Sequence, residues 1–162
     1  MAMPDYIDNL ETWKKEFTYY STVTVRFSDT DAFGHMNNTK AFVYFEHARL
    51  NFFKEIGLAE EWFIGNGSTV NTGENIPVTA DLHCNYVKQI FFDEEIRIFV
   101  KAAHIGRTSV DLHYMALNEK DEIVLTGRGR MVQVSKKDGR PTPWSDYALQ
   151  CLKKSHESIV KK

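Results

Sequence analysis

The sequence predicts a single α+β domain in which an antiparallel sheet packs against one long helix. Residues 39–56 have helical apolar spacing, and five runs before and after them alternate apolar and polar residues. No internal repeat, low-complexity segment or linker interrupts the 162 residues, a length that suits one domain with a sizeable core. We therefore treat residues 1–162 as one domain.

Composition narrows the class of protein. Apolar residues make up 43% and charged residues 26%, which is ordinary for a soluble globular chain. A net charge of −2 argues against a general nucleic-acid binder. The two cysteines, Cys84 and Cys151, are far apart and predict neither a zinc site nor a disulfide framework. No signal-peptide core or membrane-length apolar run is present, so we expect a cytoplasmic protein that binds no membrane.

The amino-terminal third predicts a strand that leads into a turn. Residues 1–17 are polar with scattered aromatics and predict a loose or locally helical segment. From Tyr19 onward the chain alternates, with Val23, Val25 and Phe27 on one face. We expect this strand to run directly into the turn at 29–38.

The long helix follows that turn. Its apolar residues are spaced to line one face, and they are Ala41, Phe45, Ala48, Phe52 and Ile56. Asn37, Asn38 or Thr39 can cap its start, and Gly57 is a natural end. The charged residues expected on the opposite, solvent side are Lys40, Glu46, Arg49 and Lys54.

The rest of the chain predicts a loop, four strands and a short helix. Glycine and asparagine gather in residues 65–75, which predicts the loop. The alternating runs that predict strands lie within 76–86, 96–102, 110–116 and 123–134. Gly127 and Gly129 inside the last strand indicate a bulge or a close backbone approach. Ser145 can cap a final helix that extends to about Val160.

One stretch concentrates groups that are typical of an active site. Residues 29–38 read Asp-Thr-Asp-Ala-Phe-Gly-His-Met-Asn-Asn and lead into the helix. A helix start presents unpaired N–H groups and the positive end of the helix dipole, which favour developing negative charge. Asp31, a few residues upstream, could act on whatever those groups polarise. Asp29 is interpreted as a structural residue of the turn, because aspartate commonly bonds turn backbone.

These residues carry a resemblance to a known family. The segment from Val25 to Asn38, continued by Phe-Glu-His-Ala-Arg at 45–49, resembles the hotdog-fold acyl-CoA thioesterases of the 4-hydroxybenzoyl-CoA thioesterase superfamily. Weaker matches follow at 90–95 and 106–112, so that the resemblance spans roughly 20–143. It implies a sheet wrapped around the long helix and a homodimer or homotetramer. It also implies active sites at the subunit interface that need no metal or organic cofactor.

The resemblance also implies roles for individual residues. Asp31 matches the general base or nucleophile of the aspartate-type branch, and the backbone N–H of Asn38 matches the group that polarises the thioester carbonyl. His35 and Asn37 match the His-x-Asn-Asn variant of the turn and are expected to shape the pocket. We expect Phe33 and a partner subunit to shelter the Asp31 carboxylate.

A CoA ester also needs cations for its phosphates. The candidates are Arg107, Thr108 and Ser109 at a strand start, together with Lys136 and Arg140 near the end of the neighbouring strand. Lys88 is a weaker candidate. Aromatic residues such as Phe33, Phe42 and Phe45 are expected around the acyl group, with residues 58–76 as a possible lid.

The sequence thus predicts an acyl-CoA thioesterase that releases a free acid and CoA. Two alternatives stay open: a thioesterase for acyl-carrier proteins, and a hotdog protein that binds acyl-CoA without catalysis. A hotdog hydratase ranks lower, because its usual Asp-x-x-x-x-His spacing differs from the spacing of Asp31 and His35.

Overall fold

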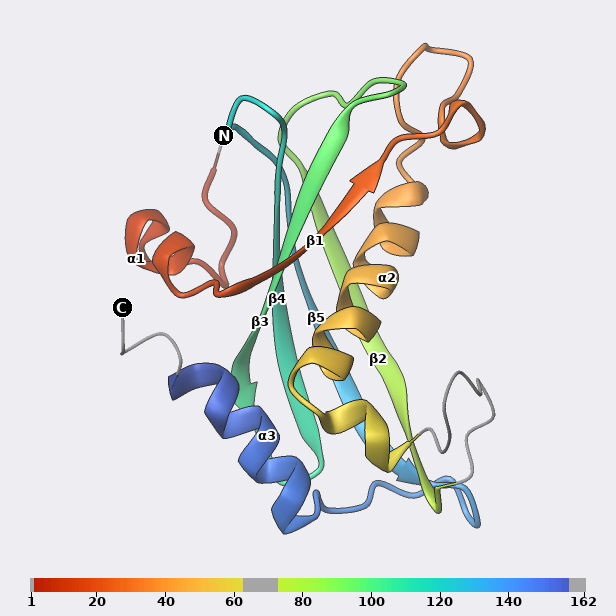
Figure 1. Ribbon diagram of the computed structural model, residues 1–162, viewed down its shortest axis with the longest axis vertical. Coiled ribbons are helices and arrows are strands. Elements are labelled where there is room, and N and C mark those ends of the chain that lie inside the picture. The colour runs from red at the N-terminus through yellow and green to blue at the C-terminus, as the bar shows by residue number, and fades with distance from the viewer. Residues whose placement is uncertain (1, 63–72, 158–162) are drawn as a thin grey trace.

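The computed structural model describes residues 2–62 and 73–157 and confirms the α+β class, with the architecture of a hotdog fold. Its sheet contains five strands, and every neighbouring pair is antiparallel. The strands are β1 (Tyr19–Thr24), β2 (Asn75–Tyr86), β3 (Glu95–Ile105), β4 (Ser109–Leu117) and β5 (Ile123–Ser135). They are arranged in the order β1-β3-β4-β5-β2, so β1 and β2 form the two edges (Figure 1).

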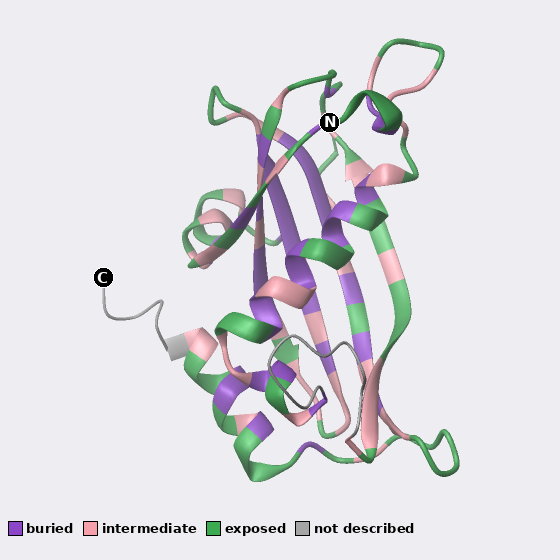
Figure 2. Ribbon diagram, turned by 45° about the vertical axis from the view of Figure 1, so that its right-hand side comes forward, coloured by how far each residue is buried: buried purple, intermediate pink, exposed green. Residues whose placement is uncertain are grey.

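Helix α2 (Lys40–Glu55) lies across one face of the sheet, as the apolar spacing predicted (Figure 1). Ala41, Phe45 and Ala48 are completely buried on its inner side. Figure 2 shows this buried side turned toward the strands. The helix ends where Gly57 takes a left-handed φ of +84°, a conformation that glycine adopts without a Cβ clash.

The position of Arg49 on the helix differs from the prediction. It was expected on the solvent side, but it is 5% exposed and is packed among buried residues. Its row on the helix contains Phe45 and Phe53, one turn before and one turn after, and both are completely buried. The charge of Arg49 suggested a solvent position, but the helix geometry places it in the core.

The start of the fold also departs from the expected strand. β1 ends at Thr24, and Phe27 begins a single 3-10 turn, η1 (Phe27–Asp29), where it is 77% exposed. The cause is local, because the Asp29 side chain accepts a hydrogen bond from the Arg26 backbone N–H (3.2 Å) and closes the turn. Alternation therefore stops before Phe27.

The two ends of the chain cover different parts of the sheet. Helix α1 (Leu10–Lys15) packs on the face opposite α2, where Trp13 Nε1 donates a hydrogen bond to His113 Nδ1 (2.9 Å). Helix α3 (Asp146–Glu157) is capped by Ser145, whose hydroxyl accepts from the Ala148 N–H (3.0 Å), and this confirms the predicted cap. The predicted end of this helix at Val160 lies outside the described residues, as does most of the loop expected at 65–75.

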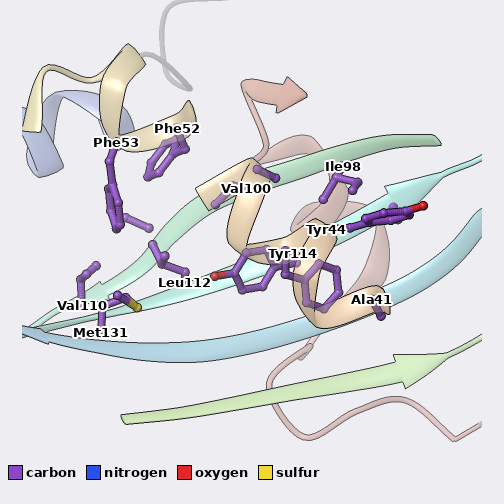
Figure 3. Packing of buried hydrophobic residues seen from close by; sticks show 14 of the residues in the cluster. Ala41, Tyr44, Phe52, Phe53, Ile98, Val100, Val110, Leu112, Tyr114 and Met131 are labelled. Carbon is purple, nitrogen blue, oxygen red and sulfur yellow. The ribbon is translucent and has the colours of Figure 1, made fainter. Parts of the chain in front are cut away.

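The core lies between α2 and the sheet (Figure 3). Gly127 confirms the predicted close approach, since a Cβ there would lie 2.5 Å from the Phe45 ring and 2.7 Å from the His83 carbonyl oxygen. The Phe45 ring in turn stacks on Tyr114 with centroids 4.5 Å apart. Within the described part of the chain, no helix is long and apolar enough to span a membrane.

Candidate active site

The turn between β1 and α2 fixes the Asp31 side chain. The Asp31 N–H donates to the His35 carbonyl (3.0 Å), and the Gly34 N–H donates to the Asp31 carbonyl (3.1 Å). Gly34 has φ +83°, which is why this tight turn favours glycine. The Asp31 carboxylate accepts a hydrogen bond from the Phe33 N–H (2.9 Å). One carboxylate oxygen is therefore held by the turn itself.

The N-cap residue of α2 is Thr39, and the side chain that bonds it belongs to Asn37 rather than to Asn38. The side-chain oxygen of Asn37 accepts from the Thr39 N–H (2.9 Å) and the Thr39 hydroxyl (2.8 Å). Asn38 is exposed, and its carbonyl oxygen accepts from the Tyr86 hydroxyl (2.6 Å). Among the residues that the structure describes, no acceptor bonds the Asn38 N–H. That N–H is thus one of the unpaired donors of a helix start.

Asp29 connects the turn to helix α2 through hydrogen bonds of its side chain and its backbone. It is completely buried, and its carboxylate accepts from the Tyr44 hydroxyl (2.8 Å) and from Arg26 Nε (3.1 Å), with Lys40 Nζ 3.5 Å away. Its backbone carbonyl accepts from the Asn37 N–H (2.8 Å). Burial alone raises the pKa of Asp29, but the hydrogen bonds from Arg26 and Tyr44 outweigh it and lower the pKa to about 2. Asp29 is therefore a structural residue, as the sequence indicated.

A cavity of about 320 Å³ opens beside these groups. The turn and helix start contribute Asp31, His35, Met36 and Asn38 to its wall. The segment that leaves β2, together with one residue of β5, forms the rest: Tyr86, Val87, Lys88, Gln89, Ile90 and Leu125. Three of the four predicted catalytic residues therefore share one cavity. The fourth, Asn37, is not among the lining residues, and its side chain instead bonds Thr39 at the start of α2.

The predicted CoA-binding residues gather elsewhere. Ser109 is paired with Val132, and the Thr108 carbonyl accepts from the Gln133 N–H (2.8 Å). The Arg140 carbonyl accepts from the Ser135 N–H (2.9 Å), and Lys136 follows directly. Arg107 lies beside them, since its carbonyl accepts from the Trp144 N–H (3.1 Å). This group is at the Ser135 end of β5, whereas the cavity is at the Leu125 end.

Lys88, the weaker candidate, lines the cavity instead. Its ammonium group pairs with the Glu122 carboxylate at 2.7 Å on the surface. Sequence reasoning gave no role to Tyr86 and Gln89, because a strand end carries no distinctive signal.

The aromatic residues proposed around the acyl group have different environments. Phe33 is 85% exposed and stacks beside His35, with centroids 6.3 Å apart. Within this chain it does not cover the Asp31 carboxylate as expected. Phe42 is 37% exposed on α2, whereas Phe45 is completely buried in the core. The possible lid at 58–76 lies largely outside the described residues.

The arrangement suits attack on a carbonyl group. A carboxylate can take a proton from water or attack directly, and an N–H at a helix start can bind the oxygen that becomes negative. Asp31 and Asn38, the residues that carry these groups, line the same cavity. The described residues contain no group of three or more His, Cys, Asp or Glu side chains placed to hold a metal ion.

Comparison with known proteins agrees with this chemistry. The family model of the thioesterase-like superfamily matches residues 25–152. The protein YsmA of Bacillus subtilis, whose function is uncharacterized, is 40% identical over 153 residues, which cover 94% of this chain and 97% of YsmA.

Solved structures share the fold. A thioesterase from Thermus thermophilus, solved in complex with coenzyme A and Zn, is 26% identical with a TM-score of 0.70, and the match covers 88% of this chain and 97% of that one. A DHNA-CoA thioesterase from Staphylococcus aureus is 20% identical with a TM-score of 0.69, covering 87% and 89% respectively, and it shows likeness of fold alone.

Proposed function

This chain belongs to the thioesterase-like superfamily and is a thioester hydrolase, and we propose that its substrate is an acyl-CoA. The observation that carries the proposal is the cavity shared by Asp31 and the helix start at Asn38. The Thermus relative bound to coenzyme A supports CoA as the leaving group. Water cleaves the thioester, and the products are a free carboxylic acid and CoA.

In the proposed reaction, the thioester carbonyl oxygen accepts a hydrogen bond from the Asn38 N–H. Asp31 either removes a proton from a water molecule that attacks the carbonyl carbon, or attacks that carbon itself to form an anhydride that water then opens. In both routes the carbon–sulfur bond breaks, and the sulfur leaves with the bonding electrons and takes up a proton. His35 borders the cavity and Asn37 holds the cap, so these residues would shape the site.

A second copy of the chain would explain why the predicted CoA-binding residues lie far from the cavity within one subunit. β2 is an edge strand of 12 residues, and the described residues place no strand on its outer side. Such an edge is a template for pairing with another chain. If two β2 strands pair antiparallel, the Asn75 end of one lies beside the Tyr86 end of the other.

That pairing would bring the distant group to the cavity. β5 pairs with β2, so Ser135 lies beside Asn75. Lys136 and Arg140 of a partner would then approach the cavity rim, with Arg107, Thr108 and Ser109 behind them. We therefore propose that the acyl group binds at Asp31 of one subunit and the CoA phosphates bind at these residues of the other.

Thiol release tests the proposal. Purified protein is supplied with a panel from acetyl-CoA to palmitoyl-CoA that includes benzoyl-CoA and 4-hydroxybenzoyl-CoA, and free thiol is measured with a chromogenic disulfide. The proposal expects turnover on at least one member. Turnover only on the same acyl groups attached to an acyl-carrier protein would identify the carrier-protein alternative. Tight acyl-CoA binding without release of thiol from any ester would identify a binding protein.

A further inference from the structure

Arg49 is a buried cation that the proposed reaction does not use. It lies in the middle of α2 and is 5% exposed. Its Nε and Nη1 atoms are shielded from solvent and have no hydrogen-bond partner among the residues that the structure describes. No acidic side chain within 2–62 or 73–156 forms an ion pair with it, and Glu46, one turn earlier, is exposed. A cation placed in this way needs a compensating group.

A second buried donor lies close to Arg49. The Tyr114 side chain, from β4, is completely buried, and within the described residues no acceptor bonds its hydroxyl hydrogen. Its ring stacks on Phe45, one helical turn before Arg49. Burial raises the pKa of Tyr114, and the positive charge of Arg49, together with hydrogen bonding from the Arg49 side chain to the phenol oxygen, opposes that rise. The two groups therefore face the same region between α2 and the sheet.

The chemistry of these donors indicates what they bind. A buried donor without an acceptor destabilises the folded state, and an unpaired buried charge destabilises it more. Apolar residues of similar volume often replace buried ions without loss of stability. A water molecule could satisfy one N–H but could not neutralise the guanidinium. An anion with one or two oxygens would satisfy the guanidinium fork and the phenol together.

We propose that Arg49 and Tyr114 bind a carboxylate, or another small monoanion, between α2 and the sheet. The anion has two possible sources. One is a free ion from solution, such as acetate or chloride. The other is a carboxylate at the far end of the acyl group, a source that rests on the proposed function. Arg49 lies about 16 Å along the helix from Asn38 at 1.5 Å per residue, so only a long acyl chain could reach it.

The first experiment measures stability and needs no enzyme activity. The melting temperature of the full chain is followed while sodium acetate replaces sodium sulfate at constant ionic strength, and chloride is tested in the same way. Arg49→Met and Tyr114→Phe are compared with the wild type. Arg97→Met serves as the matched control, because Arg97 pairs with Asp121 on the surface. Arg49→Lys is used if the methionine variant does not fold.

A bound anion predicts a saturable rise in melting temperature of roughly 2–5 °C for the wild type and Arg97→Met. The rise is absent in Arg49→Met and smaller in Tyr114→Phe. One set of results would contradict the bound anion. If all four proteins respond alike, and Arg49→Met is as stable as the wild type or more so, Arg49 is a plain buried charge and the proposal fails.

The second experiment distinguishes the sources. Thiol release is compared for dodecanoyl-CoA and for its analogue with a distal carboxylate, dodecanedioyl-CoA. At least a tenfold preference for the analogue that disappears in Arg49→Met assigns the site to the substrate. An acetate response without that preference assigns it to free anions, and absence of both effects overturns the site. If neither ester is cleaved, the thioesterase proposal is weakened, while the melting experiment still decides the anion site.

Discussion

Two aspartates separated by one residue have opposite environments at the residue scale. Asp29 is completely buried and receives hydrogen bonds from Arg26 and Tyr44. Asp31 borders the cavity, and the turn holds one of its oxygens. The first therefore fixes the geometry of the loop, and the second borders the cavity where we propose that the substrate binds. This division places a chemically available carboxylate on a rigid support.

Replacing Asp29 tests whether its ionised carboxylate stabilises the turn. Its pKa of about 2 lies below the ordinary value near 3.9, so its ionised form stabilises the fold fully above pH 4. We expect Asp29→Asn to lower the free energy of unfolding at pH 7 by about 1–3 kcal/mol. The difference from wild type should shrink as the pH falls from 4 toward 2, because the wild-type carboxylate is then protonated. Urea titrations across this range measure it.

The control for this measurement is Asp5→Asn, the same change on an exposed residue. It should follow the wild-type curve at every pH. A constant difference between Asp29→Asn and wild type down to pH 2 would show that ionisation of Asp29 is not what stabilises the turn.

The sequence was informative about this turn because its chemistry is local. Glycine at position 34, capping by Asn37 and the structural role of Asp29 all follow from short-range hydrogen bonds. The contribution of Tyr86 could not be predicted, because its hydroxyl reaches the Asn38 carbonyl across 48 positions of the chain. Long-range contacts of a single exposed tyrosine leave no pattern in a sequence.

At the scale of elements, α1 is attached to the outer face of the sheet through a neutral histidine. His113 Nδ1 accepts from Trp13, so this ring nitrogen must be unprotonated. Burial first, and then the charge of Lys101, lower the pKa of His113 to about 4. The other charged groups that influence it are Glu16, Asp111 and Arg128. In the unfolded chain the same histidine titrates near 6.5.

A base with a lowered pKa makes the folded state less stable in acid. Between about pH 6.5 and pH 4 the unfolded chain binds the proton more readily, so this stability is lost as the pH falls through that window. We expect His113→Asn to flatten the decline of the wild-type melting temperature between pH 7 and pH 5. His104→Asn, on the exposed part of β3, is the control and should keep the wild-type slope. Equal slopes in all three proteins would contradict a neutral His113.

The elements themselves could be predicted from periodicity, and the failures have physical causes. The spacing of Ala41, Phe45 and Ala48 predicts the buried side of α2, because side chains four apart lie on one face. Arg49 belongs to the same face, yet its charge led to a solvent position. Only the packing of Phe45 and Phe53 on the sheet shows that the row is buried. β1 was expected to reach Phe27 because alternation does not reveal where a side chain closes a turn.

At the scale of the whole molecule, the proposed binding of CoA requires a second subunit. The cavity and the predicted CoA-binding residues lie at opposite ends of one sheet, and pairing through β2 would unite them. Val78 is 36% exposed on β2. We expect the wild type to be a dimer or tetramer in light scattering and Val78→Lys to be monomeric, because a lysine on each β2 would place charge on the strand edge that pairs. Loss of thiol release should accompany dissociation.

The matched control places the same lysine on the other edge of the sheet. Tyr20 is 50% exposed on β1, and Tyr20→Lys should leave both the assembly and the activity unchanged. An active wild-type monomer would contradict the shared site, and so would a Val78→Lys protein that stays assembled. The sequence could not fix this arrangement, since an edge strand and a central strand show the same alternation.

The most direct test of the central claim is the rate of thiol release by Asp31→Asn on the best acyl-CoA found for the wild type. Asp5→Asn is measured alongside, and the melting temperature confirms that each variant is folded. If Asp31 is the base or nucleophile, its rate should fall by about 10²–10⁴-fold while Asp5→Asn keeps the wild-type rate. A folded Asp31→Asn protein with nearly wild-type turnover would leave the enzyme a thioesterase and remove Asp31 from its mechanism.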